Sequence, residues 1–309
     1  RVGGIQAQYA PSTYVGLWSR LHALSRDQVT RALERRRTVQ ATLMRMTIHV
    51  VARRDFWPLA LGTRAARRAR WLRTHPEAEA ALRTAADRVH ERLAGGRPLA
   101  RSELETLVGR PLAAGVGQWV DLVRLPPSGT WERRRADLFG LAENWVGPPE
   151  GSEEEGRERL VRRYLAAFGP ASRADLSSWA GVPVRVLDSA IDAVASRRLR
   201  GEDGTELLDL PRAPLPDPAT PAPVRLLPTW DATLLVHARR TGLLPDMHRP
   251  RIFSSRNPHS HPTFLVDGVV AGTWRHEDGR IALQPFGRLD AADRRALAEE
   301  AERLAAFIA

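Results

Sequence analysis

The sequence predicts a mainly α protein with small β wings, an α+β chain in which tandem winged helix-turn-helix domains follow one another. Three observations support this fold. Over residues 172–196 two helical patterns flank a short glycine turn, and a hairpin pattern follows at 199–210. A helix, helix, strand order also occupies residues 12–51. The C-terminal part shows a β-hairpin and meander pattern from 262 to 285 and an amphipathic closing helix over 290–308.

The first domain is expected to begin with two helices and a strand. Ser12 precedes apolar residues spaced three to four apart and is expected to cap the first helix, as Ser25 is for the second. Residues 47–51 alternate and are rich in β-branched side chains, which predicts a strand. Asp55 is expected to cap a further helix that reaches Leu61.

An arginine-rich stretch follows. Residues 64–73 contain five arginines, which either contact phosphates or form a solvated helix face, and the sequence favours neither interpretation. Residues 76–93 are predicted to be helical, and Ser102 is expected to open a short helix with a capping box. Residues 119–125 are predicted to form a strand.

Changes in composition mark the domain boundaries. Residues 147–156 are rich in Pro, Gly and acidic residues, and 211–223 are rich in proline, so linkers are expected in both places. The predicted domains are a winged-helix domain with following helices at 1–95, a second winged-helix-like domain at 96–148, a third winged helix-turn-helix at 157–211, and a C-terminal hairpin region with a closing helix at 224–309.

The composition excludes several kinds of chemistry. The 309 residues include no cysteine, so disulfides, thiolate catalysis and zinc sites built on cysteine are excluded. The chain has no lysine, so no side chain can form a Schiff base. No apolar run is long enough for a membrane span and the N-terminal residues lack a secretory pattern, so a cytoplasmic location is expected. No metal ion or other cofactor is predicted.

Positive charge is concentrated in one half of the chain. The net charge is +11, and residues 1–149 contain 25 arginines against 13 acidic residues, a net charge of +12. Such asymmetry favours a polyanionic partner, nucleic acid first, over a merely soluble basic surface. No phosphate-binding glycine loop and no hydrolase or metalloprotease motif is present.

A loop with two histidines allows two interpretations. His259 and His261 either ligate a metal ion or are exposed polar side chains, and the second is favoured because no carboxylates accompany them. With Arg256 and Asn257 they suit contact with a nucleic-acid backbone or groove. His49 is equally consistent with a buried structural histidine.

Two glutamine side chains near the start of the chain are further candidate functional residues. Gln6 and Gln8 follow Gly3 and Gly4, and in an extended segment their spacing points both side chains to the same side. Glycines allow a sharp turn or a close approach of the backbone. Taken alone, these residues fit a polar loop before the first helix better than a catalytic motif.

The order of several segments resembles one family. The sequence looks like the AlkZ family of winged-helix DNA glycosylases, which is related to YcaQ. The resemblance covers nearly the whole chain and is carried by residues 4–8, 14–20, 44–49, 227–231 with His237, 245–249 and 262–274. It implies a concave scaffold that binds double-stranded DNA and excises alkylated purines, including bulky adducts and crosslinks. The protein is expected to be a monomer. The Gln-x-Gln motif of the AlkZ branch matches Gln6 and Gln8, where the YcaQ branch has Gln-x-Asp.

This resemblance implies a catalytic role for the two amides. Gln6 and Gln8 are expected to orient a water molecule and to stabilise the sugar cation, in a monofunctional reaction that needs no lysine. Arg45, Thr47 and His49 are predicted to be neighbours of the site that contact DNA. Further DNA contacts are predicted for Arg256, Asn257, His259 and His261. The alternative function is a non-catalytic winged-helix DNA-binding protein, either a regulator or a protein that sequesters adducts.

Overall fold

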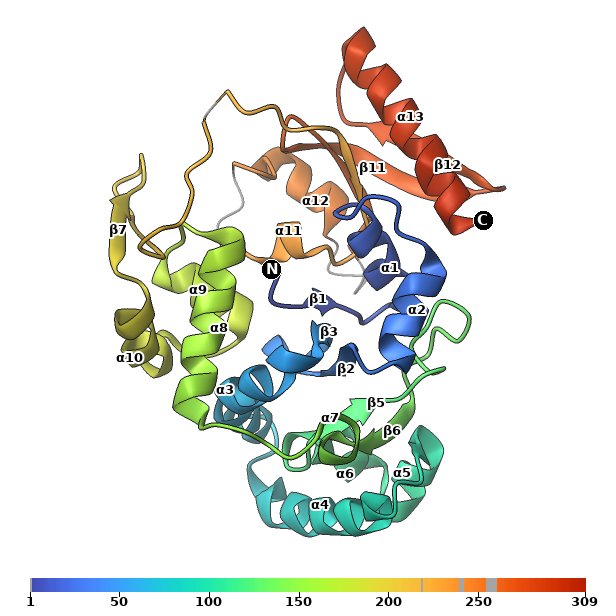
Figure 1. Cartoon of the computed structure of the whole chain (residues 1–309), viewed down its shortest axis with the longest axis vertical. Coiled ribbons are helices and arrows are strands. Elements are labelled where there is room, and N and C mark those ends of the chain that lie inside the picture. The colour runs from blue at the N-terminus through green and yellow to red at the C-terminus, as the bar shows by residue number, and fades with distance from the viewer. Residues whose placement is uncertain (1, 218, 239–241, 254–259) are drawn as a thin grey trace.

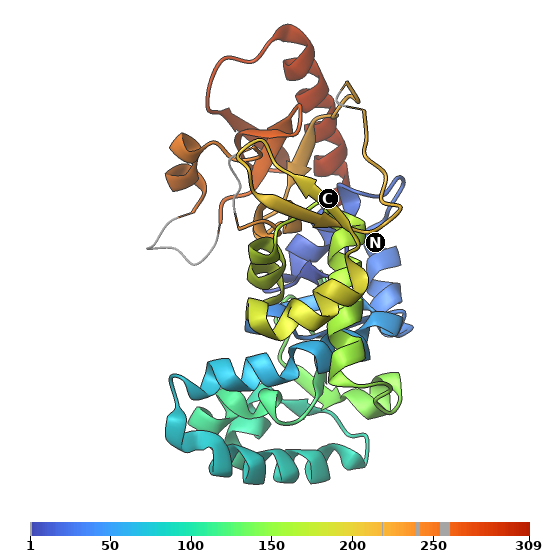
Figure 2. The same ribbon diagram turned by 90° about the vertical axis from the view of Figure 1, so that its left-hand side faces the viewer.

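The computed structural model describes residues 2–217, 219–238, 242–253 and 260–309. The molecule is elongated in both views (Figure 1, Figure 2). Helices of residues 79–115 lie at one end, and the sheet and helix of residues 263–308 lie at the other. The N-terminal strands and the helices of residues 153–194 lie between these ends and connect them.

The first segment contains the predicted helices and strands. Its elements are β1 (Ile5–Gln6), α1 (Ala10–Trp18), α2 (Arg26–Glu34), β2 (Thr38–Thr42), η1 (Met44–Met46), β3 (Ile48–Ala52) and α3 (Arg53–Leu72). Ser25 caps α2, since its hydroxyl accepts a hydrogen bond from the amide of Gln28. The prediction that Ser12 caps α1 is wrong, because the helix begins two residues earlier with Pro11 in its first turn. Asp55 also is not a cap and lies in the first turn of α3.

Helix α3 is longer than its sequence pattern predicts. It continues past Leu61, where the predicted helix ends, to Leu72, so it includes the arginine-rich stretch up to Arg70, and Arg73 follows as the C-cap residue. It packs along α8 (Glu153–Phe168), where two glycines face each other. A Cβ on Gly62 would lie 2.6 Å from the carbonyl carbon of Gly156. This close helix packing stabilises α3 beyond the proline, which by itself favours a kink or an end.

The second segment shares a sheet with the first. Its elements are η2 (Pro76–Ala78), α4 (Glu79–Ala94), β4 (Leu99–Ala100), α5 (Arg101–Val108), α6 (Arg110–Gly115), η3 (Val116–Gln118), β5 (Leu122–Arg124), β6 (Leu138–Leu141) and α7 (Ala142–Val146). Six strands form one antiparallel sheet in the order β1-β3-β2-β5-β6-β4. Gln40 of β2 pairs with Arg124 of β5, so strands from both sides of the predicted boundary at residues 95 and 96 are hydrogen-bonded to each other.

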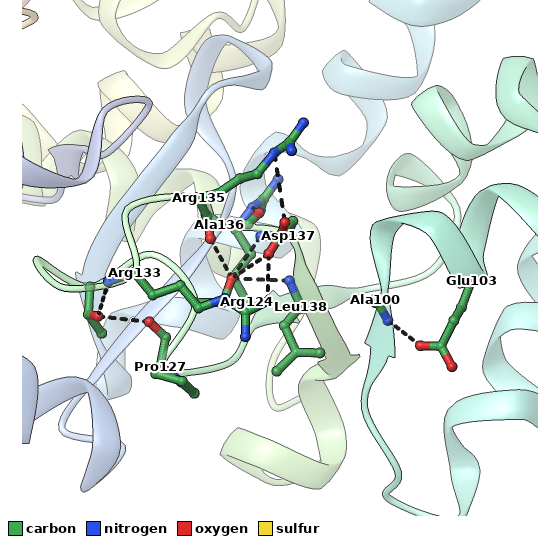
Figure 3. Close-up of polar contacts among 11 residues, drawn as sticks. Ala100, Glu103, Arg124, Pro127, Arg133, Arg135, Ala136, Asp137 and Leu138 are labelled. Atoms are coloured by element: carbon green, nitrogen blue, oxygen red, sulfur yellow. Dashed lines mark hydrogen bonds and ion pairs between the residues drawn. The ribbon is translucent and has the colours of Figure 1, made fainter.

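Polar contacts fix the start of α5 and the loop between β5 and β6 (Figure 3). The carboxylate of Glu103 accepts a hydrogen bond from the amide of Ala100 at 2.7 Å, so Ala100 is the cap residue and not Ser102. In the loop, the hydroxyl of Ser128 accepts from the amide of Asp137 at 2.7 Å. The loop is therefore tied back to the strand that follows it.

The third segment confirms the predicted helix-turn-helix with a hairpin. It contains α8, α9 (Arg173–Ala180), α10 (Val184–Val194), β7 (Arg197–Arg200) and β8 (Glu206–Asp209). Ser152 and Ser172 cap α8 and α9 through their hydroxyls. Because Ser152 is the cap, α8 begins before residue 157 and shortens the predicted linker. Gly181 ends α9 with a left-handed φ of +69°, as its place between two helices predicts.

The C-terminal segment forms the predicted meander and closing helix. Its elements are β9 (Arg225–Leu227), α11 (Ala232–Leu235), η4 (Asp246–His248), α12 (Arg249–Ile252), β10 (Thr263–Val266), β11 (Val269–Glu277), β12 (Arg280–Pro285) and α13 (Ala291–Ile308). Asp267 and Gly268 both have positive φ in the β10–β11 turn, which confirms the hairpin. Asp290 caps α13. An ion pair of 2.7 Å between Arg20 and Asp231 joins this segment to the turn that follows α1.

Within residues 2–217, helices followed by an antiparallel strand pair occur three times, in α1–β3, α5–β6 and α8–β8, which confirms a mainly α fold with small sheets. In the part of the chain that the structure describes, no helix combines the length and the apolar character that a membrane crossing requires.

Candidate functional site

Gln6 lies where the first strand meets β3. It pairs with His49 across the strands, and its side chain is buried. Gly4 precedes it with a φ of +142°, and a Cβ there would lie 3.0 Å from Cγ1 of Val51 and 3.1 Å from Cε of Met44. The glycine therefore allows β1 to pack directly against these side chains and sets the position of Gln6.

Arg45 is a direct partner of Gln6. Its Nη2 donates a hydrogen bond to Oε1 of Gln6 at 2.9 Å, and its Nη1 donates to the backbone carbonyl of Trp179 in α9. Arg45 and Met46 have positive φ values of 54° and 63°, in the turn between β2 and β3. Because non-glycine residues in this conformation cost on the order of 1 kcal/mol each, the surrounding contacts must hold the turn.

The helix-turn-helix holds Arg45 in place. Gly181, the residue after α9, lies against the backbone of Arg45, and a Cβ on Gly181 would lie 2.8 Å from both N and Cα of that residue. Sequence reasoning identified Gly181 as a helix break, whereas its contact with residue 45 and the role of Trp179 were missed. No local pattern reports such contacts, because about 135 residues separate the partners.

His49 is a buried, neutral histidine. Its Nδ1–H donates to the carbonyl oxygen of Thr47 at 3.0 Å, so Nε2 is an acceptor that faces Nη2 of Arg45 at 3.4 Å. Burial, together with the nearby positive charge of Arg45, lowers the pKa of His49 to about 3. Only 2% of His49 is exposed, so the structure favours a role in which its ring helps to hold the guanidinium of Arg45. A direct contact of His49 with DNA stays a prediction.

Gln8 lies at the surface beside the same strand. Its Oε1 accepts a hydrogen bond from the amide of Ile48 at 3.0 Å, while the hydroxyl of Thr47 donates to the carbonyl of Met44 at 3.2 Å. Gln6 and Gln8 thus contact one short segment of the chain, although Gln6 is buried and Gln8 is exposed. The residues that the structure brings together here are Gln6, Gln8, Arg45, Thr47 and His49.

His261 lies at a separate cavity of about 540 Å³. Tyr9, the residue after Gln8, lines this cavity together with Trp131, Arg134 and Trp274. His261 therefore lies on a cavity that reaches the residue next to the Gln-x-Gln motif. The other predicted DNA contacts of this loop, Arg256, Asn257 and His259, lie outside the described residues. Among the residues that are described, no group of three or more His, Asp or Glu side chains is placed to hold a metal ion.

Nearly the whole chain matches one known family. The family model described as DNA glycosylase AlkZ-like matches residues 1–307. The chain belongs to the AlkZ-like DNA glycosylase family. The solved structure of Streptomyces sahachiroi DNA glycosylase AlkZ has the same fold, with a TM-score of 0.83 and 20% sequence identity. That similarity covers 100% of this chain and 89% of the other. A comparison with curated proteins finds no match.

Membership of the AlkZ-like family supports a DNA glycosylase activity and DNA as the substrate. The family match includes β1, β3 and the helix-turn-helix, and hence all parts of the cluster around Gln6. A polyanionic substrate also agrees with the positive charge of residues 1–149. In the AlkZ-like fold, three segments that are distant in sequence meet at Arg45.

Proposed function

We propose that this chain is a monofunctional DNA glycosylase that hydrolyses the N-glycosidic bond of N7-alkylated purines in double-stranded DNA. Gln6 and Gln8 are the proposed catalytic pair. The observation that carries this proposal is the position of Gln6, whose amide oxygen is fixed by Arg45 at the junction of three chain segments. Bulky adducts and interstrand crosslinks belong to the same chemical class of substrate. We further propose that the protein acts as a monomer in the cytoplasm.

The chemistry suits neutral amides. An N7-alkylated purine carries a positive charge, so it leaves as a neutral base and needs no strong acid. What remains is to place a water molecule and to stabilise an oxocarbenium-like sugar, as in glycoside hydrolysis. His49 is no candidate for a general acid, because a group whose pKa is about 3 is unprotonated near neutral pH.

The hydrogen bonds define how the two amides are oriented. Arg45 and the Ile48 amide are donors only, so each must face the oxygen of its glutamine. An amide oxygen has two lone pairs, and on each glutamine one of the two accepts the hydrogen bond just described. The second lone pair of Gln6 and of Gln8 can accept from water and present negative charge to the sugar.

Release of free base from DNA tests this function. Wild-type protein is expected to release N7-methylguanine from methylated duplex DNA in single-turnover reactions, and to leave an intact abasic strand. Gln6→Ala and Gln8→Ala should each slow release by on the order of 100-fold, as loss of a preorganised polar group does. Gln28→Ala is the matched control, because Gln28 is an exposed glutamine on α2.

The same experiment separates the alternative function. A non-catalytic DNA-binding protein would bind the methylated duplex in a salt-dependent manner and release no base from it. The glycosylase proposal would be contradicted if the protein bound methylated DNA and bulkier N7-alkylguanine substrates but released no free base from either. Strand cleavage at the lesion without alkali would contradict the monofunctional mechanism.

A further inference from the structure

A groove lies between the end of α3 and the turn that joins α9 to α10. We call it the α3–α10 groove; its volume is about 640 Å³. Arg70 of α3 and Arg73, the residue after α3, line one side, Arg185 of α10 lines the other, and Arg45 forms part of the wall. The same arginine that holds Gln6 therefore borders the groove.

The structure divides the five arginines of residues 64–73 into two groups. Three of them bind the segment that follows α6: Arg64 pairs with Asp121 at 2.7 Å, Arg67 donates to Oε1 of Gln118, and Arg68 donates to the Gln118 carbonyl. These three arginines hold α3 against the second segment. Their role is internal to the protein.

The remaining two arginines of the stretch point elsewhere. Arg70 and Arg73 are exposed, as is Arg185 across the groove. Within residues 2–217, 219–238, 242–253 and 260–309, none of these three side chains has an ion pair or a side-chain hydrogen bond. Their charges are thus uncompensated by the described part of the protein. The sequence left phosphate contact and a solvated helix face equally open. Arg64, Arg67 and Arg68 fit neither alternative, because they contact the protein itself, whereas the exposed Arg70 and Arg73 are consistent with both.

The lining of the groove has a single sign of charge. Its other residues are small, apolar or hydroxyl-bearing, and none is acidic. The larger cavity of about 760 Å³ beside the start of α3 differs, because Glu150 and Glu155 accompany its arginines. A concave surface that carries only positive charges focuses the electric field and attracts anions. Guanidinium groups in particular match the geometry of phosphate oxygens.

We propose that the α3–α10 groove binds the backbone phosphates of one DNA strand and leads that strand past Arg45 to Gln6. The assignment of Gln6 as the destination rests on the proposed function. Arg70, Arg73 and Arg185 are the phosphate contacts.

The salt dependence of DNA binding tests the proposal. The full chain is titrated with a labelled, undamaged DNA duplex over a series of salt concentrations. The double variant Arg70→Ala/Arg73→Ala should lower the slope of log affinity against log salt by about two, one for each lost phosphate contact. The double variant Arg88→Ala/Arg295→Ala removes the same charge from exposed sites on α4 and α13 and should leave the slope nearly unchanged.

Three outcomes would overturn the proposal. One is an unchanged slope in the groove variant, and another is an equal change in both double variants, which would indicate a general charge effect. The third is an equal loss of affinity for polyglutamate of the same charge, which would indicate a surface for any polyanion. Because both positions are exposed, the variants should keep the wild-type thermal unfolding temperature.

Base release distinguishes this proposal from the proposed function. If the wild type releases no base while the groove variant still loses its two units of slope, the groove is a DNA site and the glycosylase proposal fails. If the wild type releases N7-methylguanine while the slope of the groove variant equals that of the wild type, the function stands and the groove proposal fails. Arg70→Lys/Arg73→Lys should retain most of the slope, because it keeps both charges.

Discussion

Nη2 of Arg45 lies 2.9 Å from Oε1 of Gln6, and Nη1 of the same guanidinium donates a hydrogen bond to the carbonyl of Trp179. One side chain thus connects the first strand of the chain with the helix-turn-helix of the third segment. The position of the Gln6 amide depends on both contacts. In the proposed mechanism Arg45 is for this reason a positioning residue, which acts on the reaction through Gln6.

Replacement of Arg45 by lysine separates position from charge. Arg45→Lys keeps the positive charge but loses the planar group that reaches two acceptors at once. We expect single-turnover base release to fall by on the order of 10- to 100-fold, because small displacements of a catalytic group have effects of this size. The salt slope of DNA binding should stay as in the wild type. Base release at the wild-type rate would show that Gln6 keeps its position without the guanidinium.

The neutral state of His49 predicts a pH dependence of stability. In the unfolded chain His49 binds a proton below its ordinary pKa of 6.5, whereas in the fold it does so only below a pKa of about 3. Between these values the unfolded state holds one more proton, so lowering the pH destabilises the fold. From about pH 7 to about pH 5 this amounts to about 2 kcal/mol of unfolding free energy.

His49→Gln removes this proton uptake. Urea unfolding at several pH values should show a smaller loss of unfolding free energy toward pH 5 in the variant than in the wild type. Parallel curves for the two proteins would mean that His49 titrates alike in both states. The variant also tests whether an uncharged acceptor beside Arg45 is sufficient for base release.

Local signals in the sequence were sufficient for much of the fold. Ser172 begins helix α9 and Gly181 ends it through contacts within a few residues. The Asp267–Gly268 turn defines its hairpin in the same local way. Helix α3 was predicted to end at Leu61, whereas it continues to Leu72 through Gly62, whose packing on α8 is a distant contact. Long-range packing thus decides what local propensity leaves open.

The candidate site was predictable only in part. Gln6 and Gln8 were identified through the order of segments around them, and their structure shows a cluster with residues 45–49. The left-handed turn at Arg45 and Met46 was not visible, because no glycine marks it. Contacts that hold this turn come from α9, and no pattern within either segment reports them.

The buried carboxylate of Asp55 predicts a strong coupling between α3 and α8. Asp55 accepts hydrogen bonds from Arg159 and Arg163 at 2.9–3.0 Å and is buried. Asp55→Asn leaves two guanidinium groups without their counter-ion, so we expect a loss of about 3 kcal/mol in unfolding free energy by urea denaturation. Asp27→Asn is the control, since the exposed pair of Asp27 and Arg31 should contribute less than about 0.5 kcal/mol. Similar losses in both variants would refute this difference.

Gly181 gives the sharpest test of the link between the helix-turn-helix and the site. In Gly181→Ala the new Cβ must lie about 2.8 Å from the backbone of Arg45, in addition to the strain of a left-handed alanine. Gly204→Ala is matched to it, because Gly204 has a φ of +81° and no heavy atom within 4 Å of the added Cβ.

The two alanine variants should therefore differ in both stability and activity. Gly204→Ala is expected to lose about 1 kcal/mol of unfolding free energy, and Gly181→Ala about 1–3 kcal/mol more because its neighbour must move. Since that neighbour is Arg45, Gly181→Ala should also slow base release in the folded protein, as Arg45→Lys does. Gly204→Ala should release base at the wild-type rate. Equal base release by both variants would show that the contact between Gly181 and Arg45 does not affect Gln6.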